Sequence, residues 1–95
     1  MELAKVVGQV VATARAPGLP NNSLLLVQFL DEKGGPTGHC HVAADPVGAG
    51  DGEWVLVVRG SSARCAISPD APLDLVIVGI VDTVSSQTGI VYRKN

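Results

Sequence analysis

Residues 54–59 have the sequence Trp54-Val55-Leu56-Val57-Val58-Arg59, and this run indicates the fold class. A short apolar run rich in β-branched valine is typical of a strand in the core of a β-protein. Glycine-rich sequence precedes it at 48–52, and Gly60 follows it, so turn residues bound the run on both sides. We therefore expect a core strand over residues 54–59 that is buried on both faces.

Short apolar runs separated by Gly, Pro, Asn, Asp and Ser continue in both directions along the chain. They predict strands at 5–14, 23–30 and 38–44 before the central run, and at 73–84 and 90–93 after it. Residues 31–35 favour a tight turn, because glycine and aspartate tolerate the backbone angles that such turns need. The strands at 23–30 and 38–44 should therefore form a hairpin.

Residues 61–66 are the one helical candidate, because Ser61 is a good helix N-cap and Pro69 would end the helix soon afterwards. The length of 95 residues suits one domain, 1–95, and is too short for two. Several short strands with a single small helix predict an all-β fold, a small OB-like β-barrel of five to six strands with one short helix.

The amino-acid composition argues against several classes of function. Hydrophobic residues make up 46% and charged residues 17%, below the roughly 25% typical of soluble domains, so another subunit is expected to cover apolar surface. No apolar run approaches the ~20 residues of a membrane-spanning helix, and no signal peptide is apparent, which indicates a cytosolic chain. Cys40 and Cys65 are then expected to be free thiols. A net charge of −2 with scattered basic residues argues against nucleic acid as a partner.

The segment His39-Cys40-His41 carries residue types that bind zinc or copper. In a strand, residues two apart share a face, so both imidazoles would point one way and the thiol the other. Two ligands without an obvious third favour a surface strand with Cys40 in the core, and no metal site is predicted.

Two further groups of residues give only weak indications of a functional site. The segment Gly48-Ala49-Gly50-Asp51-Gly52 resembles a phosphate-binding loop, but a strand follows it instead of a helix N-terminus, which favours a tight turn. Ser61 or Ser62 with His39 or His41 and with Asp45 or Asp82 would supply the residue types of a hydrolase triad. Neither serine lies in a Gly-x-Ser-x-Gly elbow, so no catalytic residue and no cofactor are predicted.

Asp82 follows the apolar run 76–81 and is more informative. A carboxylate at the end of a buried strand must either face water or find a hydrogen-bond donor. That donor could belong to another subunit, and the residues alone leave both possibilities open.

Several blocks together resemble the vertex proteins of bacterial microcompartments, the EutN/CcmL family. The first two strands of the family are similar to residues 3–13 and 23–27, and its central loop and following strand are similar to Asp45, 47–50 and 52–55. The two most characteristic blocks are similar to 60–64 and 78–82. The resemblance covers nearly the whole chain, in order and at fitting spacing.

This resemblance implies a non-enzymatic shell protein in the bacterial cytoplasm. Its OB-like protomers would form a homo-pentamer that caps the vertices of an icosahedral microcompartment, beside hexameric or trimeric shell proteins. Subunit contacts or the ring axis would involve residues from three places in the chain: Gly48, Ala49, Gly50, Gly60, Ser61, Ser62, Arg64 and Asp82. The alternatives are a small OB-like binding module, which three aromatic residues and few basic ones disfavour, and a His/Cys metal-binding protein.

Overall fold

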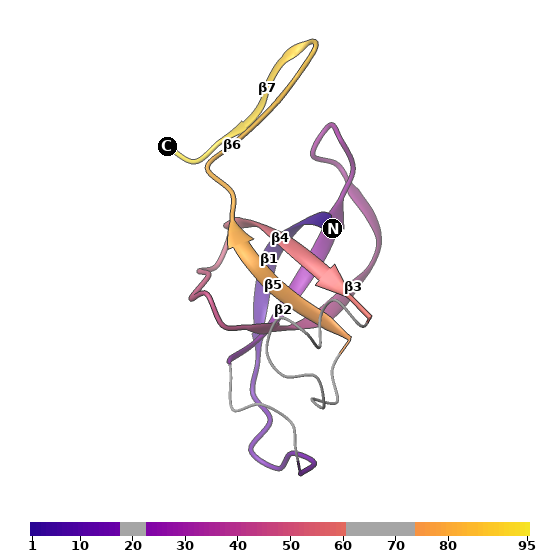
Figure 1. The fold of residues 1–95 in the computed structure, drawn as a ribbon, viewed down its shortest axis with the longest axis vertical. Coiled ribbons are helices and arrows are strands. Elements are labelled where there is room, and N and C mark those ends of the chain that lie inside the picture. The colour runs from indigo at the N-terminus through magenta and orange to yellow at the C-terminus, as the bar shows by residue number, and fades with distance from the viewer. Residues whose placement is uncertain (18–22, 61–73) are drawn as a thin grey trace.

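The computed structural model describes residues 1–17, 23–60 and 74–95, which contain seven β-strands. Figure 1 shows them in chain order: β1 Glu2–Val10, β2 Ser23–Leu30, β3 Pro36–Asp45, β4 Trp54–Arg59, β5 Leu75–Ile80, β6 Thr83–Ser86 and β7 Gly89–Arg93. Within the described ranges no residue is helical, so none of them belongs to a helix that could cross a membrane. The short helix expected at 61–66 lies outside these ranges.

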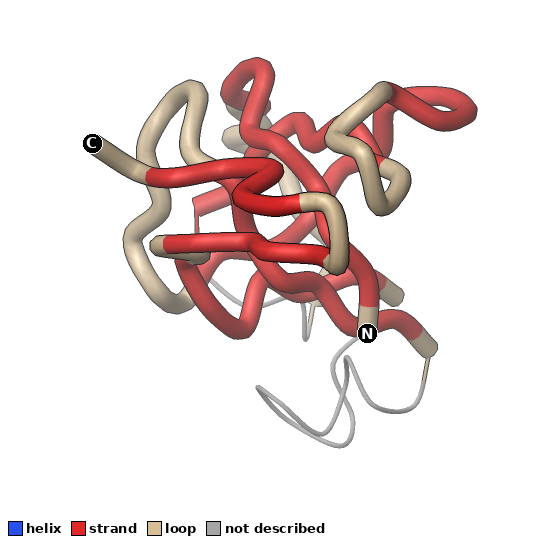
Figure 2. Tube along the Cα trace, turned by 90° about the horizontal axis from the view of Figure 1, so that it is seen from above, coloured by secondary structure: helices blue, strands red, loops and turns tan. Residues whose placement is uncertain are grey.

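Five strands close into a barrel in the order β1-β2-β3-β5-β4, which confirms the expected all-β fold. All neighbours are antiparallel except β3 and β5, which run parallel and pair at Ala44 and Val76. The strands β6 and β7 form a separate two-stranded sheet beyond the barrel (Figures 1 and 2). The chain thus has one barrel and one projecting hairpin.

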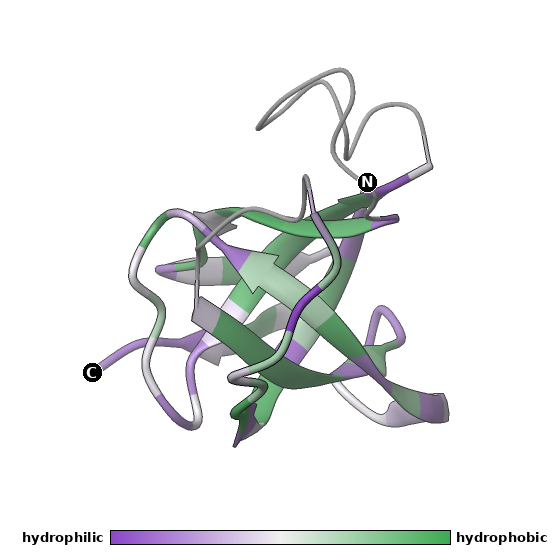
Figure 3. Cartoon of the chain, turned by 90° about the horizontal axis from the view of Figure 1, so that it is seen from below, coloured by the Kyte–Doolittle hydropathy of each residue, from purple (hydrophilic) through white to green (hydrophobic). Residues whose placement is uncertain are grey.

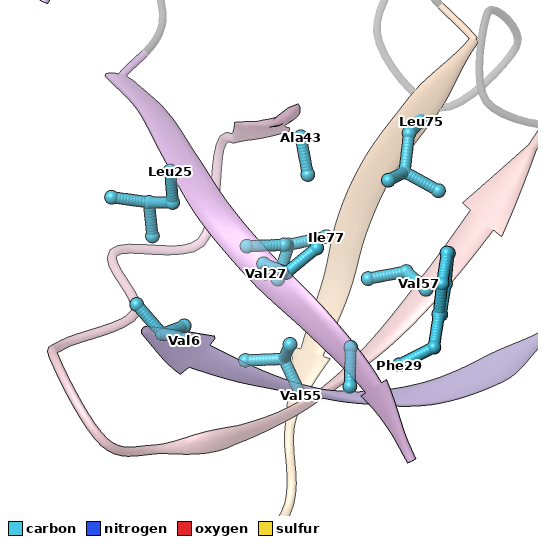
Figure 4. Close-up of a cluster of buried hydrophobic side chains, with 10 residues drawn as sticks. Val6, Leu25, Val27, Phe29, Ala43, Val55, Val57, Leu75 and Ile77 are labelled. Carbon is cyan, nitrogen blue, oxygen red and sulfur yellow. The ribbon is translucent and has the colours of Figure 1, made fainter. Parts of the chain in front are cut away.

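The core fills the barrel because alternate residues of each strand point inward. Side chains from all five barrel strands meet there (Figure 4): Ala4, Val6, Leu25, Val27, Phe29, Ala43, Val55, Val57, Leu75 and Ile77. Figure 3 shows that hydrophobic residues are concentrated in the strands and hydrophilic residues in many of the connecting turns. Burial of each valine or isoleucine contributes roughly 1.5–3 kcal/mol.

Two strands were predicted with their observed bounds, β2 at 23–30 and β4 at 54–59. The expectation that β4 is buried on both faces is only half right, because Val55 and Val57 are buried inside whereas Trp54, Leu56 and Val58 are half-buried outside. Phe29 of β2 lies in the core.

Two predicted strands need correction. The first strand ends at Val10 and does not continue to residue 14. The strand expected at 73–84 is broken at Val81 and Asp82, where Val81 N donates to the carbonyl of Trp54 (2.9 Å). This bond extends the pairing of β4 with β5 by one residue, and the chain leaves the barrel after it to enter β6.

The turn predicted at 31–35 is present and is organised by one carboxylate. Asp31 Oδ1 accepts hydrogen bonds from Lys33 N (2.8 Å) and Gly35 N (2.9 Å), and Gly34 adopts a φ of 85°. These amide bonds stabilise the charged carboxylate and hold the pKa of Asp31 below its usual value.

Candidate functional site

The central loop connects β3 to β4 and is built around Asp45, the one charged residue that is buried in the described part of the chain. Its Oδ1 accepts hydrogen bonds from Val47 N (3.1 Å) and Gly48 N (3.0 Å), and its Oδ2 accepts one from Ala49 N (2.8 Å). A buried carboxylate is tolerated only when such donors replace water. Asp45 therefore fixes the path of the loop from the end of β3.

The other end of the central loop is held by Glu53 and by β1. Gly50 N donates to Glu53 Oε1 (2.5 Å), while Gly52 N donates to the carbonyl of Val6 (2.9 Å). Ala49 packs against the barrel core between these two anchors. The loop is thus a rigid turn that leads into a strand, as expected, and no helix N-terminus follows it to face a phosphate.

Glu53 also binds the C-terminal segment. Its Oε2 lies 2.5 Å from Lys94 Nζ, and Lys94 N donates to the carbonyl of Asp82 (2.8 Å). The lysine and the Gly50 amide hold the pKa of Glu53 below its usual value, and Glu53 raises the pKa of Lys94. The central loop, Asp82 and the chain end are therefore linked at one end of the barrel.

Stacked aromatic rings join the projecting hairpin to the same end of the barrel. The rings of Trp54 and Tyr92 are parallel to within 13°, with their centroids 4.1 Å apart. Gly34 lies against Trp54, because a β-carbon at this position would come within 2.6 Å of the indole ring. A lone tryptophan beside a glycine-rich turn gives no sequence signal for such a contact, and we did not predict it.

The structure separates the expected site residues into two groups. Gly48, Ala49, Gly50 and Asp82 lie at the end of the barrel where β4 begins, and Gly60 lies at the other end of β4. Asp82 is exposed. Gly60 is also exposed, with a φ of 68°, and its amide donates to the carbonyl of Asp74 (2.9 Å). Ser61, Ser62 and Arg64 lie outside the described residues.

The expectation for His39-Cys40-His41 is wrong in one respect, because Cys40 is exposed and does not fill the core. In the β2–β3 register His41 lies opposite the inward-facing Val27, which places the thiol of Cys40 on the outer face, where it donates to Gln28 Oε1 (3.4 Å). The ring of His41 lies 4.7 Å from that of Phe29. The described residues hold no group of three metal-binding side chains.

Arg59 closes the far end of the barrel beside Phe29. Its guanidinium lies 4.7 Å from the centroid of the Phe29 ring and makes two hydrogen bonds to Glu2, of 2.6 and 2.9 Å. This bidentate pairing lowers the pKa of Glu2 and raises that of Arg59. The ion pair ties the start of β1 to the end of β4.

The closed five-stranded barrel, with its projecting two-stranded sheet, places the chain in the class of small all-β barrel proteins. A family model described as "Ethanolamine utilisation protein EutN/carboxysome" matches residues 1–82. The chain belongs to the EutN/CcmL family.

Similar proteins agree with this assignment along the whole chain. Over 95 residues the chain is 55% identical to the carboxysome shell vertex protein CcmL of Synechocystis sp., with 99% of this chain and 95% of that protein covered. It is 50% identical to the bacterial microcompartment shell vertex protein EutN of Escherichia coli, with 99% and 100% covered.

Two solved structures are similar in fold. The carboxysome subunit CcmL has a TM-score of 0.93 at 54% identity, with all of both chains covered. The GrpN pentameric microcompartment shell protein from Rhodospirillum rubrum has a TM-score of 0.82 at 46% identity, with 90% of this chain and 99% of that chain covered.

Proposed function

We propose that this chain is a non-enzymatic shell protein that forms a homo-pentamer and caps the vertices of a bacterial microcompartment in the cytoplasm. The observation that carries the proposal is sequence identity of half or more, along almost the whole chain, to two shell vertex proteins. The structural likeness to a pentameric shell protein supports the ring size. In this role the 95 residues act as one domain, and the barrel is of the OB-like type.

The role follows from geometry. Six-fold tiles alone make a flat sheet, and a closed shell needs five-fold units at its corners. A ring of five requires a heterologous contact, in which one surface of each protomer meets a different surface of the next. Hexameric or trimeric shell proteins would then surround each pentamer.

Apolar residues on the outside of the barrel support burial between protomers. Val7, Val42 and Val78 are 43%, 46% and 36% exposed, although they lie on barrel strands. We assign the ring contacts or the ring axis to the central loop, Gly48 to Gly50, to Asp82, and to Gly60 with Ser61, Ser62 and Arg64. The loop suits this role because Asp45 and Glu53 already hold its amides, so docking orders little additional backbone.

Native mass spectrometry tests the proposal directly. We expect a single particle of five 9.7 kDa chains at micromolar protomer concentration. A stable monomer under these conditions would refute it. Metal analysis of the same sample tests the alternative that the chain is a metal-binding protein, because that alternative requires stoichiometric zinc or copper.

A further inference from the structure

The β6–β7 hairpin has no partner for its outer edges among residues 1–17, 23–60 and 74–95. Its two strands pair only with each other in this part of the chain, and Figure 1 shows the hairpin extending beyond the barrel. An isolated two-stranded hairpin is at best marginally stable in water. Something beyond the two strands must therefore hold it in place.

The composition of the hairpin lacks the usual protection of an exposed strand edge. Soluble monomers protect such edges with charged residues or proline, which discourage pairing with another chain. Residues 83–92 contain no Asp, Glu, Lys, Arg or Pro, so Arg93 at the end of β7 is the one charged residue of the hairpin, and Ile90 is 55% exposed. This composition is typical of an edge that another chain covers.

The root of the hairpin is firmly held even though its edges are free. Tyr92 stacks on Trp54, and Lys94 binds both Glu53 and the carbonyl of Asp82. These contacts fix the direction in which the hairpin extends before any partner arrives. A preorganised arm of this kind loses little conformational entropy on binding.

We propose that the β6–β7 hairpin of one protomer docks edge-on against β3 of a second copy of this chain. The inference rests on the proposed ring and specifies one of its contacts. If two hairpins paired through the same edge, the contact would be isologous and would close at two chains. In a five-membered ring the hairpin must therefore meet a different surface of its neighbour.

Strand β3 offers the matching surface. Residues 36–42 are all exposed, and one edge of this segment pairs with β2. Along its other edge, the pairing between described residues is limited to Ala44 with Val76, which leaves 36–42 unpaired on that side in the described ranges. The segment contains no Asp, Glu, Lys or Arg, and its one proline, Pro36, is the first residue of the strand, so residues 37–42 match the uncharged residues 83–92 of the hairpin. Two unpaired, uncharged edges can extend one sheet across the contact.

Cys40 allows a direct test, because its exposed thiol lies within the proposed receiving segment. In a Cys65→Ser background, single changes Ser85→Cys, Gln87→Cys, Thr88→Cys and Ile90→Cys sample the hairpin. A disulfide forms only when the two Cα atoms lie within about 7 Å. We expect mild oxidation to link at least one variant into chains of up to five subunits through Cys40, and Cys40→Ser to abolish the links. Normal rings in which no hairpin cysteine bonds to Cys40 would overturn the inference.

A charge on the hairpin gives a second, independent readout. Ile90→Lys should weaken each contact roughly tenfold or more, because a desolvated ammonium would face an uncharged edge. Val11→Lys is the matched control, since Val11 is 80% exposed and lies outside the strands. If the wild-type chain is not pentameric, the proposed function fails. If the wild-type and Ile90→Lys chains are equally stable pentamers, the function stands and the hairpin contact is refuted.

Discussion

Replacing Asp45 should destabilise the protein more than any other single change in the central loop. Asp45→Ala removes the acceptor of three backbone amides at once. Val47 and Gly48 are exposed, so water can satisfy their amides, whereas Ala49 is half-buried and packs on the core. A lost bond to a charged acceptor costs about 1.5–3 kcal/mol, and bonds replaced by water cost less, so we expect a total of roughly 3 kcal/mol. Asp45→Asn keeps one carbonyl acceptor and should cost about 1 kcal/mol.

Urea unfolding followed by far-ultraviolet circular dichroism, at one fixed protomer concentration, measures these costs. The fixed concentration matters because ring formation adds to the apparent stability. Asp51→Ala is the control, since Asp51 is exposed on the same loop, and it should change stability by less than about 0.5 kcal/mol. Equal losses for Asp45→Ala and Asp51→Ala would refute the claim that the buried carboxylate organises the loop. A loss for Asp45→Asn as large as that for Asp45→Ala would refute the bond-by-bond reasoning.

Three further predictions concern the turns, acid stability and assembly. Gly34→Ala should lower the urea midpoint more than Gly38→Ala. Both glycines have a positive φ, but only at Gly34 would the new β-carbon strike the indole of Trp54. Equal losses of stability in the two variants would contradict this contact. Glu2, Glu53 and Asp31 have lowered pKa values in the folded state, so the unfolded chain binds protons first and stability should fall as the pH drops below 4.5 and then 3.8. A urea midpoint that stays constant from pH 6 to pH 3 would contradict these shifts. Asp82→Leu and Arg64→Leu should disturb assembly more than barrel folding, and unchanged particle mass by native mass spectrometry in both variants would reject this assignment.

The barrel strands could largely be predicted because their signals are local. The run at 54–59 and the strand at 23–30 are bounded by turn residues, and their apolar residues match the pleat of a sheet. The break at Val81 and Asp82 could not be predicted, because these residues bond to Trp54 and Lys94, which are distant in sequence, and the apolar run itself continues through Val81. A local apolar run does not reveal such contacts.

Which face of β3 points into the barrel could also not be predicted from the local sequence. The side on which Cys40 lies depends on its register with β2, and a shift of one residue exchanges the two faces. The central loop was recognisable from its glycines, but the role of Asp45 depends on three amides that converge only in the folded chain. Site residues within 61–64 remain predictions.

The stack of Trp54 on Tyr92 has a practical consequence. The chain has one tryptophan and one tyrosine, and the fold places them in direct contact. The intrinsic fluorescence of Trp54 therefore reports whether the β6–β7 hairpin is attached to the barrel, and no added dye is needed. If the indole emission changes before the barrel's circular dichroism signal is lost, the β6–β7 hairpin detaches from Trp54 while the barrel stays folded.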